Sequence, residues 1–531
     1  MKTMLNKLLG LVGLVVLSFG VLADDWQQAA SGLTGKSSNH KLAAIEAMLE
    51  FDDPRNAVAL QGMLDAELYY VKADRQLVIA TKSGRSFLLT DLQGESLGEV
   101  AKSKIKRITV NNRIRREIRS GLAMMALAGP DEDARFSAVR SLMANVEAEQ
   151  LPLVEQRLVA ETSAKVQDKL RELQAIILLE NGDDAQRQSS AEFLGGRMDA
   201  PSRNALLRAQ SDEQNAEVLA AINESVARNQ QLLKLNRAAE NLYFGLSLGA
   251  VLLLAAVGLA ITFGVMGVIN MAHGEMIMLG AYTTYVVQQL MPGHIELSLV
   301  VAIPAAFLVS GAMGVLIERG IIRFLYGRPL ETLLATFGLS LVLQQLVRSI
   351  FGPLNQAVIT PQWLSGSLEI NGVLALTYNR LYIIIFSFMV VAALWLLISK
   401  TFFGLQVRAV TQNRAMANAM GIRSSWVDAM TFGLGSGVAG IAGVALSQLT
   451  NVGPNLGQNY IIDSFMVVVF GGVGNLFGTV VAAMTLGVAN KLAEPFTGAV
   501  LAKILVLVFI ILFIQKRPRG MFALKGRMVE D

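Results

Sequence analysis

The feature that most constrains this chain is a succession of long apolar stretches that begins after residue 240. Each is about as long as the ~20 residues that an α-helix needs to cross a bilayer. They lie near residues 241–263, 272–291, 297–318, 330–350, 380–399, 426–449 and 499–515, with a broken pair within 463–490. Of the 88 Asp, Glu, Lys and Arg residues, only 26 fall after residue 240. We therefore expect an all-α polytopic membrane domain of eight or nine transmembrane segments over residues 241–531.

The N-terminus has the pattern of an export signal. Residues 1–23 begin with Lys2 and Lys7, continue with an apolar core, and end at Ala23 with small or short residues that suit cleavage before Asp24. The alternative is an uncleaved anchor helix, but an apolar run of ~16 residues is short for a membrane span.

The distribution of Lys and Arg over the connecting loops gives independent support for this orientation. If residues 24–235 are exported, alternation places 319–328, 400–425 and 516–531 in the cytoplasm, and these segments hold twelve Lys and Arg residues. The loops expected outside hold one, Lys491. Cytoplasmic loops of membrane proteins are enriched in Lys and Arg. The sequence therefore predicts a multi-pass protein of a bacterial inner membrane, with residues 24–235 in the periplasm.

The exported part, residues 24–235, combines two kinds of pattern. Residues 64–110 alternate like short strands, whereas the flanking stretches carry apolar residues at helical spacing. Acidic residues at Asp131 and Asp183 are typical of helix starts. We expect a mainly helical, solenoid-like domain with helix pairs every 25–45 residues or so, and a small β insertion at about 64–110. Two roles remain open, a docking surface for a periplasmic partner and a spacer without a ligand.

Two short motifs in this part suggest ligands that its position argues against. Residues 30–37 read A-x-x-x-x-G-K-S, a relaxed phosphate loop, but that loop needs a buried strand before it, where this chain has the export signal. The basic run RIRREIR at 113–119 is typical of a solvated helix face; lipid headgroups and nucleic acid are the alternatives. The chain has no cysteine and three scattered histidines. We expect no catalytic residue, metal or cofactor in this chain, and no nucleic-acid partner.

Two of the apolar segments are interrupted by glycine. ITFGVMGVINMAHGEMIMLGAY at 261–282 and FMVVVFGGVGNLFGTVVAAMTLG at 465–487 both fit F-G-x-x-G-x11-L-G. Broken segments at matching places in two halves are typical of transporters with an internal repeat, and their freed backbone groups must face protein or a wet cavity. The sequence therefore predicts that Gly472 and Gly474 line a substrate path.

Three polar residues, Asn270, His273 and Glu275, follow the first interruption. An ionised Glu near mid-bilayer costs about 3 kcal/mol, so such residues suggest function. Three interpretations of Glu275 are open: it lines the path, it pairs inside the bundle or caps a broken helix, or it lies in water at the inner interface. We count Asn270, His273 and Glu275 as candidate path residues, and one His with one Glu does not imply a metal.

Three signatures carry a resemblance to a known family. They are FGVMGVINMAHGEMIMLGAY, the loop GLQVRAVTQNRAMANAMGI at 404–422, and VVVFGGVGNLFG further on. Together they resemble the membrane subunits of branched-chain amino acid ABC importers over most of 241–531. The long exported part departs from the short amino-acid permeases, and is similar to the urea-transport permease of the same family, in which such an extension occurs.

The resemblance implies a role for the cytoplasmic loop 400–425. In this family the loop forms a coupling helix that lies in a groove of the cytoplasmic ATPase. Without the resemblance, an amphipathic connector held by anionic headgroups is an equal alternative. The candidate coupling residues are Gly404, Arg408, Asn413, Arg414, Ala417 and Gly421.

The expected function is therefore that of a permease subunit of an ATP-driven importer for a small polar solute. Urea is the preferred solute, for which Asn270, Gln288, Gln289, Gln344 and Gln345 offer amide partners, and a branched-chain amino acid is the alternative. The implied partners are a second permease subunit, two ATPase subunits that use the ATP, a periplasmic substrate-binding protein and membrane lipid. Two other hypotheses are an ATP-independent channel or carrier, and a membrane-anchored scaffold, which has no use for broken helices.

Overall fold

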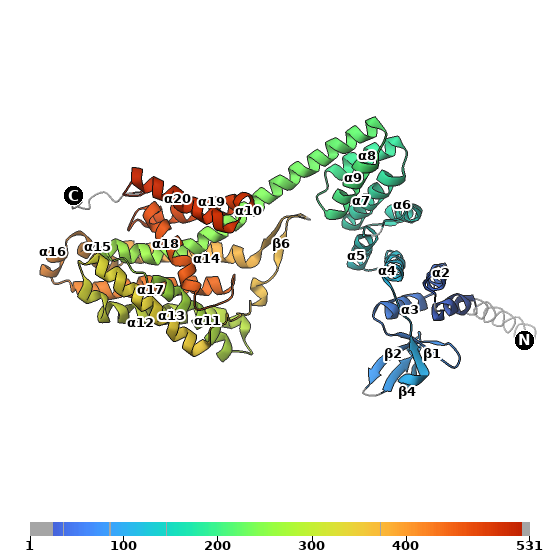
Figure 1. Ribbon diagram of the computed structural model, residues 1–531, viewed down its shortest axis with the longest axis horizontal. Helices are drawn as coiled ribbons and strands as arrows, with labels where there is room; N and C mark the ends of the chain where they lie inside the picture. Colours follow the sequence, from blue (N-terminus) through green and yellow to red (C-terminus); the bar gives the residue numbers. More distant parts are fainter. Residues whose placement is uncertain are drawn as a thin grey trace, which may run out of the picture. The chain divides into compact units, whose positions relative to one another are not determined.

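The computed structural model describes residues 25–35, 37–51, 53–83, 86–144, 146–371 and 373–522. The predicted signal peptide at 1–23 lies outside these described residues. The chain divides into two compact units between Leu232 and Leu233. Both units are mainly helical, as expected, and the first also contains a small sheet (Figure 1).

The first unit begins with helices and an antiparallel sheet. Its elements here are η1 (Gly32–Thr34), α2 (Ser38–Leu49), α3 (Arg55–Leu64), β1 (Leu68–Val71), β2 (Leu77–Ser83), β3 (Ser86–Thr90), β4 (Ser96–Ala101), η2 (Lys102–Lys104) and β5 (Ile105–Arg107). The strand order is β4-β3-β2-β1-β5. Successive side chains of a strand point to opposite faces. Leu77 and Ile79 accordingly pack with the helices, while Val78 and Ala80 pack on the other face.

The relaxed phosphate-loop motif follows a helix rather than a strand. Residues 25–31 are helical, η1 continues them, and Ser37 is the N-cap of α2. Lys36 lies outside the described residues. Since a phosphate loop starts from a buried strand, the surroundings of the motif do not provide that geometry.

The rest of the first unit is a stack of short helices. They are α4 (Asn112–Ala126), α5 (Glu132–Leu142), η3 (Ala148–Gln150), α6 (Leu151–Ala160), α7 (Ala164–Asn181), α8 (Asp184–Gly195), α9 (Ala200–Asp212) and the start of α10 (Ala216–Met266). Side chains of Asn111, Asp131, Ser163, Asp183 and Asp199 cap the starts of α4, α5, α7, α8 and α9. Such caps satisfy backbone N–H groups that have no partner within the helix.

Polar contacts between the stacked helices recur at a nearly constant sequence separation. Arg135 binds Glu161 at 2.9 Å, 26 residues away, and Lys169 binds Asp199 at 3.1 Å, 30 residues away. Ser202 and Glu172, also 30 residues apart, form a further hydrogen bond. A spacing that repeats in this way is typical of a helical solenoid.

The second unit is a bundle of longer helices. After α10 come α11 (His273–Leu290), α12 (Ile295–Gly320), η4 (Ile322–Leu325), α13 (Pro329–Phe351), η5 (Gln362–Leu364), β6 (Ser367–Glu369), β7 (Ala375–Thr377), α14 (Tyr378–Lys400), α15 (Phe402–Gln412), α16 (Arg414–Ala419), α17 (Ser424–Ser447), α18 (Leu456–Gly471), α19 (Leu476–Thr497) and α20 (Ala499–Lys516). Within the described ranges, seven of these helices are long and apolar enough to span a membrane: α10, α12, α13, α14, α17, α19 and α20.

The polytopic helical fold is thus confirmed, and α11 and α18 account for the difference from the eight or nine expected segments. α18 has 16 residues, which is short for a span. α11 has 18 residues but begins with His273 and Glu275 and ends near two glutamines, which lowers its apolar character.

Glycine allows the central helix α17 to approach its neighbours closely. Every residue from Gly435 to Ser447 is buried. A Cβ atom on Gly280 of α11 would lie 2.0 Å from the carbonyl oxygen of Gly440, and a Cβ atom on Gly435 would lie 2.6 Å from that of Gly258 on α10. Small residues at helix interfaces are typical of membrane bundles, in which packing replaces the hydrophobic effect.

The first glycine interruption folds the chain back along α10. α10 ends at Met266, and residues 267–272 form no helix or strand. His273, which starts α11, places its Nε2 atom 2.9 Å from the carbonyl oxygen of Ala255, eleven residues before Met266. Eleven helical residues span about 16 Å. α11 therefore begins beside the interior of the apolar part of α10 and not beside its end.

The second interruption is a tight turn between α18 and α19. Gly472 and Gly474 have φ angles of +104° and +80°, which non-glycine residues rarely adopt. A Cβ atom on Gly264, near the end of α10, would lie 2.5 Å from the Cα atom of Gly474. The turn therefore lies beside the last residues of α10, and it differs in shape from the longer first interruption.

Candidate solute path and coupling segment

Glu275 lies in the first turn of α11 and contacts α13. Its Oε1 atom accepts hydrogen bonds from Ser340 Oγ and Gln344 Nε2, both at 2.8 Å. Glu275 is 1% exposed, and its Oε2 atom has no hydrogen-bond partner among the described residues. This burial is at odds with the interpretation in which Glu275 lies in water at the inner interface. It leaves one paired and one unpaired carboxyl oxygen inside the membrane unit.

His273 faces a different side of α11. Residues two positions apart on an α-helix are rotated by about 200°, and His273 contacts Ala255 of α10 rather than α13. Since a carbonyl oxygen only accepts, we assign the proton of the neutral ring to Nε2, and Nδ1 has no partner within the described ranges. The structure therefore separates His273 from Glu275 and gives His273 a role in joining α11 to α10.

Asn270 lies in the non-helical segment 267–272 before α11. Its Oδ1 atom accepts a hydrogen bond from Ala272 N at 3.0 Å, and its Nδ2 atom has no partner in the part of the chain that the structure describes. The next residue, Met271, donates its backbone N–H to Thr336 Oγ1 of α13 at 3.1 Å. The non-helical segment and the first turn of α11 therefore both contact α13 through polar groups.

α13 presents a buried polar stripe to these groups. Thr332, Thr336, Ser340 and Gln344 recur every four residues, and none is more than 5% exposed. Residues at this spacing lie on one face of a helix. We call these four side chains, together with Met271 N–H and Glu275, the α11–α13 seam.

Only part of this seam was predicted from the sequence. Gln344 and Gln345 were both predicted to offer amide partners, but Gln344 is buried and Gln345 is exposed. Thr336 and Ser340 were not predicted. The signal that could have found them is the four-residue spacing of polar residues within an otherwise apolar helix.

Gly472 and Gly474 do not belong to the seam. Gly474 lies against Gly264, which is nine residues beyond Ala255 on α10. Nine helical residues correspond to about 14 Å along the axis. The structure therefore does not bring these two glycines together with Glu275, and their role in a solute path stays a prediction.

A later segment of the chain completes the turn that holds these glycines. Met521 N donates to Phe470 O at 2.9 Å, and Phe522 N donates to Gly471 O at 3.2 Å. Asn475 Nδ2 donates to Phe522 O at 3.0 Å. The carbonyl groups that are freed at the end of α18 are thus paired with residues that follow α20.

The predicted coupling loop folds as the two short helices α15 and α16. Gly404 packs tightly at the start of α15, since a Cβ atom there would lie 1.9 Å from the carbonyl oxygen of Ile398. Arg408 donates a hydrogen bond to the same carbonyl. Both residues therefore fix α15 to the end of α14.

One side of α16 is buried against neighbouring helices, and the other side is exposed. Asn413 caps it by accepting a hydrogen bond from Met416 N at 2.9 Å, and Ala417 is buried in an apolar cluster. Gly421, with φ of +83°, follows the helix. Met416 and Met420, one turn apart, are 61% and 77% exposed. Flexible apolar side chains of this kind are suited to binding another protein surface.

Arg414 is engaged within the chain. Its guanidinium binds both carboxyl oxygens of Asp428, at 2.7 and 3.0 Å, and the hydroxyl of Tyr326 at 2.6 Å. It also lies 4.3 Å from the centre of the Tyr326 ring. Bidentate pairs of this kind fix geometry as well as charge. Arg414 therefore holds α16 against the start of α17.

One further charged pair within the membrane unit was not found from the sequence. Lys503 of α20 lies 3.1 Å from Asp463 of α18, and their side chains are 50% and 11% exposed. Charged residues in spanning segments usually pair with one another. A search for acidic and basic residues on separate apolar segments would have found both members.

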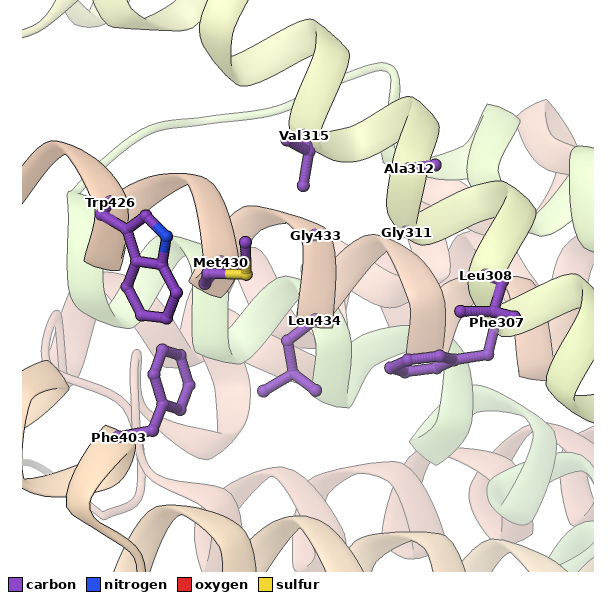
Figure 2. A pocket seen from close by; sticks show the side chains of 10 residues that line it. All are labelled: Phe307, Leu308, Gly311, Ala312, Val315, Phe403, Trp426, Met430, Gly433 and Leu434. Atoms are coloured by element: carbon purple, nitrogen blue, oxygen red, sulfur yellow. The ribbon is translucent and has the colours of Figure 1, made fainter.

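An apolar cavity of about 490 Å³ lies among α12, α15 and α17 (Figure 2). Phe403 and Trp426 lie at one end with ring centres 6.5 Å apart, and Phe307 and Leu308 lie at the other. Apart from the indole N–H, the lining side chains are apolar. This cavity suits a hydrocarbon chain rather than a polar solute.

Comparison with known proteins matches residues 241–514 to the family described as branched-chain amino acid transport system, permease component. The permease protein BraD of the high-affinity branched-chain amino acid transport system of Pseudomonas aeruginosa is 30% identical over 290 residues, 53% of this chain and 94% of BraD. The LivH permease proteins of Salmonella typhimurium and Escherichia coli are 31% and 29% identical over the same shares. No solved structure matches. Since the family match spans more than half of its length, this chain belongs to the permease components of branched-chain amino acid transport systems.

Proposed function

We propose that this chain is the permease subunit of an ATP-driven importer in a bacterial inner membrane, and that it forms the solute path with a second permease subunit. The observation that carries the proposal is the α11–α13 seam. Buried hydroxyl, amide and carboxyl groups cost free energy wherever they are not hydrogen-bonded, and polar residues inside a membrane bundle typically mark a solute or ion path. A polar solute that crosses the membrane needs such groups.

The proposal includes two cytoplasmic ATPase subunits and a periplasmic substrate-binding protein. The exposed methionines Met416 and Met420 give α16 an apolar contact for an ATPase groove, while Arg414 holds α16 in place from behind. Gly404, Arg408, Asn413, Ala417 and Gly421 shape the segment around that contact. In this arrangement ATP binding moves α15 and α16, and the membrane helices follow.

The location of the first unit in the periplasm is part of the proposal. The Lys and Arg distribution supports it, with twelve such residues in the loops placed inside and one in those placed outside. Cysteines introduced by Arg115→Cys and Asn418→Cys test it in intact spheroplasts. An impermeant thiol reagent should label the first variant and not the second, and the reverse pattern would refute the orientation.

A branched-chain amino acid is the solute that the relatives support. The names of these relatives state this substrate class, and they align over 94% of their own length. An amino acid has an ammonium group that donates and a carboxylate that accepts. The unpaired Glu275 Oε2 offers an acceptor and the unpaired Asn270 Nδ2 offers a donor.

Urea is the second candidate, favoured by the long first unit. The relatives align with 53% of this chain, and the family match begins at residue 241. The first unit therefore lies outside the part that these relatives match, and a long extension is what the resemblance to a urea permease implies. Urea also carries both N–H donors and a carbonyl acceptor, so the same unpaired atoms suit it.

Uptake by vesicles that contain the complete transporter distinguishes the two solutes. Leucine uptake that excess urea leaves unchanged supports the amino acid, and urea uptake that leucine leaves unchanged supports urea. Uptake should require ATP and the binding protein. Uptake by vesicles that contain this chain alone, without ATP, would instead establish a channel or carrier and refute the importer.

A further inference from the structure

We propose that the stripe of α13 formed by Thr336, Ser340 and Gln344 lines the solute path, and that Ser340, Gln344 and Glu275 form a binding site for a solute that bears both N–H and C=O groups. The inference deepens the proposed function and rests on it. It adds α13 to a path that the sequence placed at the two glycine interruptions.

The carboxyl group of Glu275 can accept more hydrogen bonds than the described residues give it. Glu275 Oε2 is buried and has no partner among the described residues, although Oε1 of the same carboxyl group accepts two hydrogen bonds. A buried polar atom without a hydrogen-bond partner costs free energy. A solute N–H group that donates to Oε2 removes this cost, so the seam favours N–H donors over purely apolar solutes.

The side chains of Ser340 and Gln344, which face Glu275, can exchange hydrogen-bond partners. Ser340 Oγ and Gln344 Nε2 lie 3.3 Å apart and both donate to one oxygen. A hydroxyl or amide side chain can also accept. A solute with both donors and acceptors can therefore insert between Glu275 and α13 and leave few groups unpaired.

The α11–α13 seam lies inside the second unit. α11 begins beside the interior of α10, so Glu275 and the stripe meet within the apolar part of the unit and not at its surface. The stripe continues from Thr332 near the start of α13 to Gln344 past its middle. Twelve helical residues cover about 18 Å, which is more than half of the ~30 Å hydrocarbon thickness.

The other faces of α13 provide matched controls. Phe337, Leu341 and Gln345 each follow a stripe residue directly, and all three are exposed and face away from the seam. The chain contains no cysteine. In a single-cysteine variant of the full chain, a thiol reagent therefore reacts with this chain only at the introduced position.

The test uses the complete transporter in vesicles and a small charged methanethiosulfonate reagent. The stripe variants are Thr336→Cys, Ser340→Cys and Gln344→Cys, and the controls are Phe337→Cys, Leu341→Cys and Gln345→Cys. Charged reagents do not enter hydrocarbon, so during ATP turnover we expect the stripe cysteines to react about tenfold faster than the controls. Excess transported solute should slow their reaction at least threefold.

Faster labelling of the controls, or labelling of the stripe that solute does not slow, would overturn the inference. Variants that fail to assemble are replaced by Ser340→Ala and Gln344→Leu, with Gln345→Leu as control. The inference predicts that the first two change the ratio of leucine to urea uptake severalfold and the third does not; equal ratios in all three would also overturn it. The proposed function fails separately, if the unmodified transporter takes up neither solute.

Discussion

The two units of this chain use different groups to set the packing of their helices. Among the described residues of the first unit, nine ion pairs join residues 53–213, and several link helices about 30 residues apart in the sequence. In the second, five ion pairs are described, and backbone contacts at glycine bring the helices together.

This difference in packing groups follows from the solvent around each unit, which is water for the first and lipid for the second. In water, burial of apolar side chains drives association, and polar pairs at the rim then fix the alignment of neighbouring helices. In lipid, apolar side chains gain little from leaving the hydrocarbon, and close approach of backbones contributes more. Glycine should therefore be far less replaceable in the second unit than in the first.

The largest expected effect is that of Gly280→Ala. The new Cβ atom would lie 2.0 Å from the carbonyl oxygen of Gly440, so α11 and α17 must separate. Overpacking against backbone should cost about 3 kcal/mol or more, with loss of most monodisperse protein in detergent chromatography. The control is Gly338→Ala on α13, which meets nothing within 4 Å. Equal yields of the two variants would contradict glycine packing as the organising contact.

Arg414→Ala tests the ion pair of the second unit that most resembles those of the first. Asp428 is 3% exposed and loses its bidentate partner, while Arg414 itself is partly exposed. We expect a destabilisation of about 1–3 kcal/mol and ATP hydrolysis that no longer depends on solute delivery. Stimulated ATPase activity of the complete transporter measures this. Arg328→Ala, which removes an exposed pair with Glu331, is the control and should retain stimulation.

Glu172→Gln tests one of the buried charged groups that join helices of the first unit. Burial raises the pKa of Glu172 to about 7, and nearby Asp199 adds to the rise, although Lys169 opposes it. A carboxyl with a raised folded-state pKa stabilises the fold at low pH, and this contribution is lost as the pH rises from about 4.5 to about 7. Replacement by Gln should remove that loss, on the order of 1–3 kcal/mol.

Hydrogen exchange of peptides from α7 to α9 in the full chain measures this change after correction for intrinsic rates. Protection in the native chain should fall between pH 5 and pH 7, and protection in Glu172→Gln should stay level. Asp199 does not obscure the result, because its pKa is lowered to about 2 and its own transition lies at more acidic pH. Parallel profiles in the two proteins would show that the pair does not titrate in this range.

The smallest expected effect is that of Gly98→Ala in β4. Gly98 has φ of +88° but meets nothing within 4 Å of a new Cβ atom. The cost is conformational alone, about 1–2 kcal/mol. A loss of protein as large as that from Gly280→Ala would show that glycine serves the same purpose in both units.

Local patterns in the sequence predicted the spanning helices and many helix starts. Hydropathy located the membrane helices, and acidic caps such as Asp131 and Asp183 marked where α5 and α8 begin. These features depend on neighbours within a few residues. They could therefore be predicted without knowledge of the tertiary structure.

The depth of α11 and the partners of its polar residues depend on distant parts of the chain. Hydropathy predicted that residues 272–291 cross the membrane like the other apolar segments. The contact of His273 with Ala255 instead places the start of α11 beside the interior of α10. The partners of Glu275 lie 65 and 69 residues away on α13. The sequence could identify Glu275 as unusual but could not show which helix it contacts.

The role of Arg414 could not be predicted from the sequence for the same reason. The sequence indicated a charged residue in a cytoplasmic loop, which suggests a partner outside the chain. Tyr326, 88 residues earlier, and Asp428 occupy its guanidinium instead. The exposure of the α16 methionines depends on which side of that helix is buried, so the sequence alone could not predict it.

The hydrogen bonds of Met521 and Phe522 with the end of α18 have a consequence for biogenesis. The carbonyl groups of Phe470 and Gly471 are synthesised about fifty residues before the amide groups that pair with them. Until those residues leave the ribosome, the hairpin of α18 and α19 carries unmatched carbonyls beside the bilayer, where water must supply their bonds. These carbonyl groups at the end of α18 therefore gain their partners within the chain only after translation has passed α20.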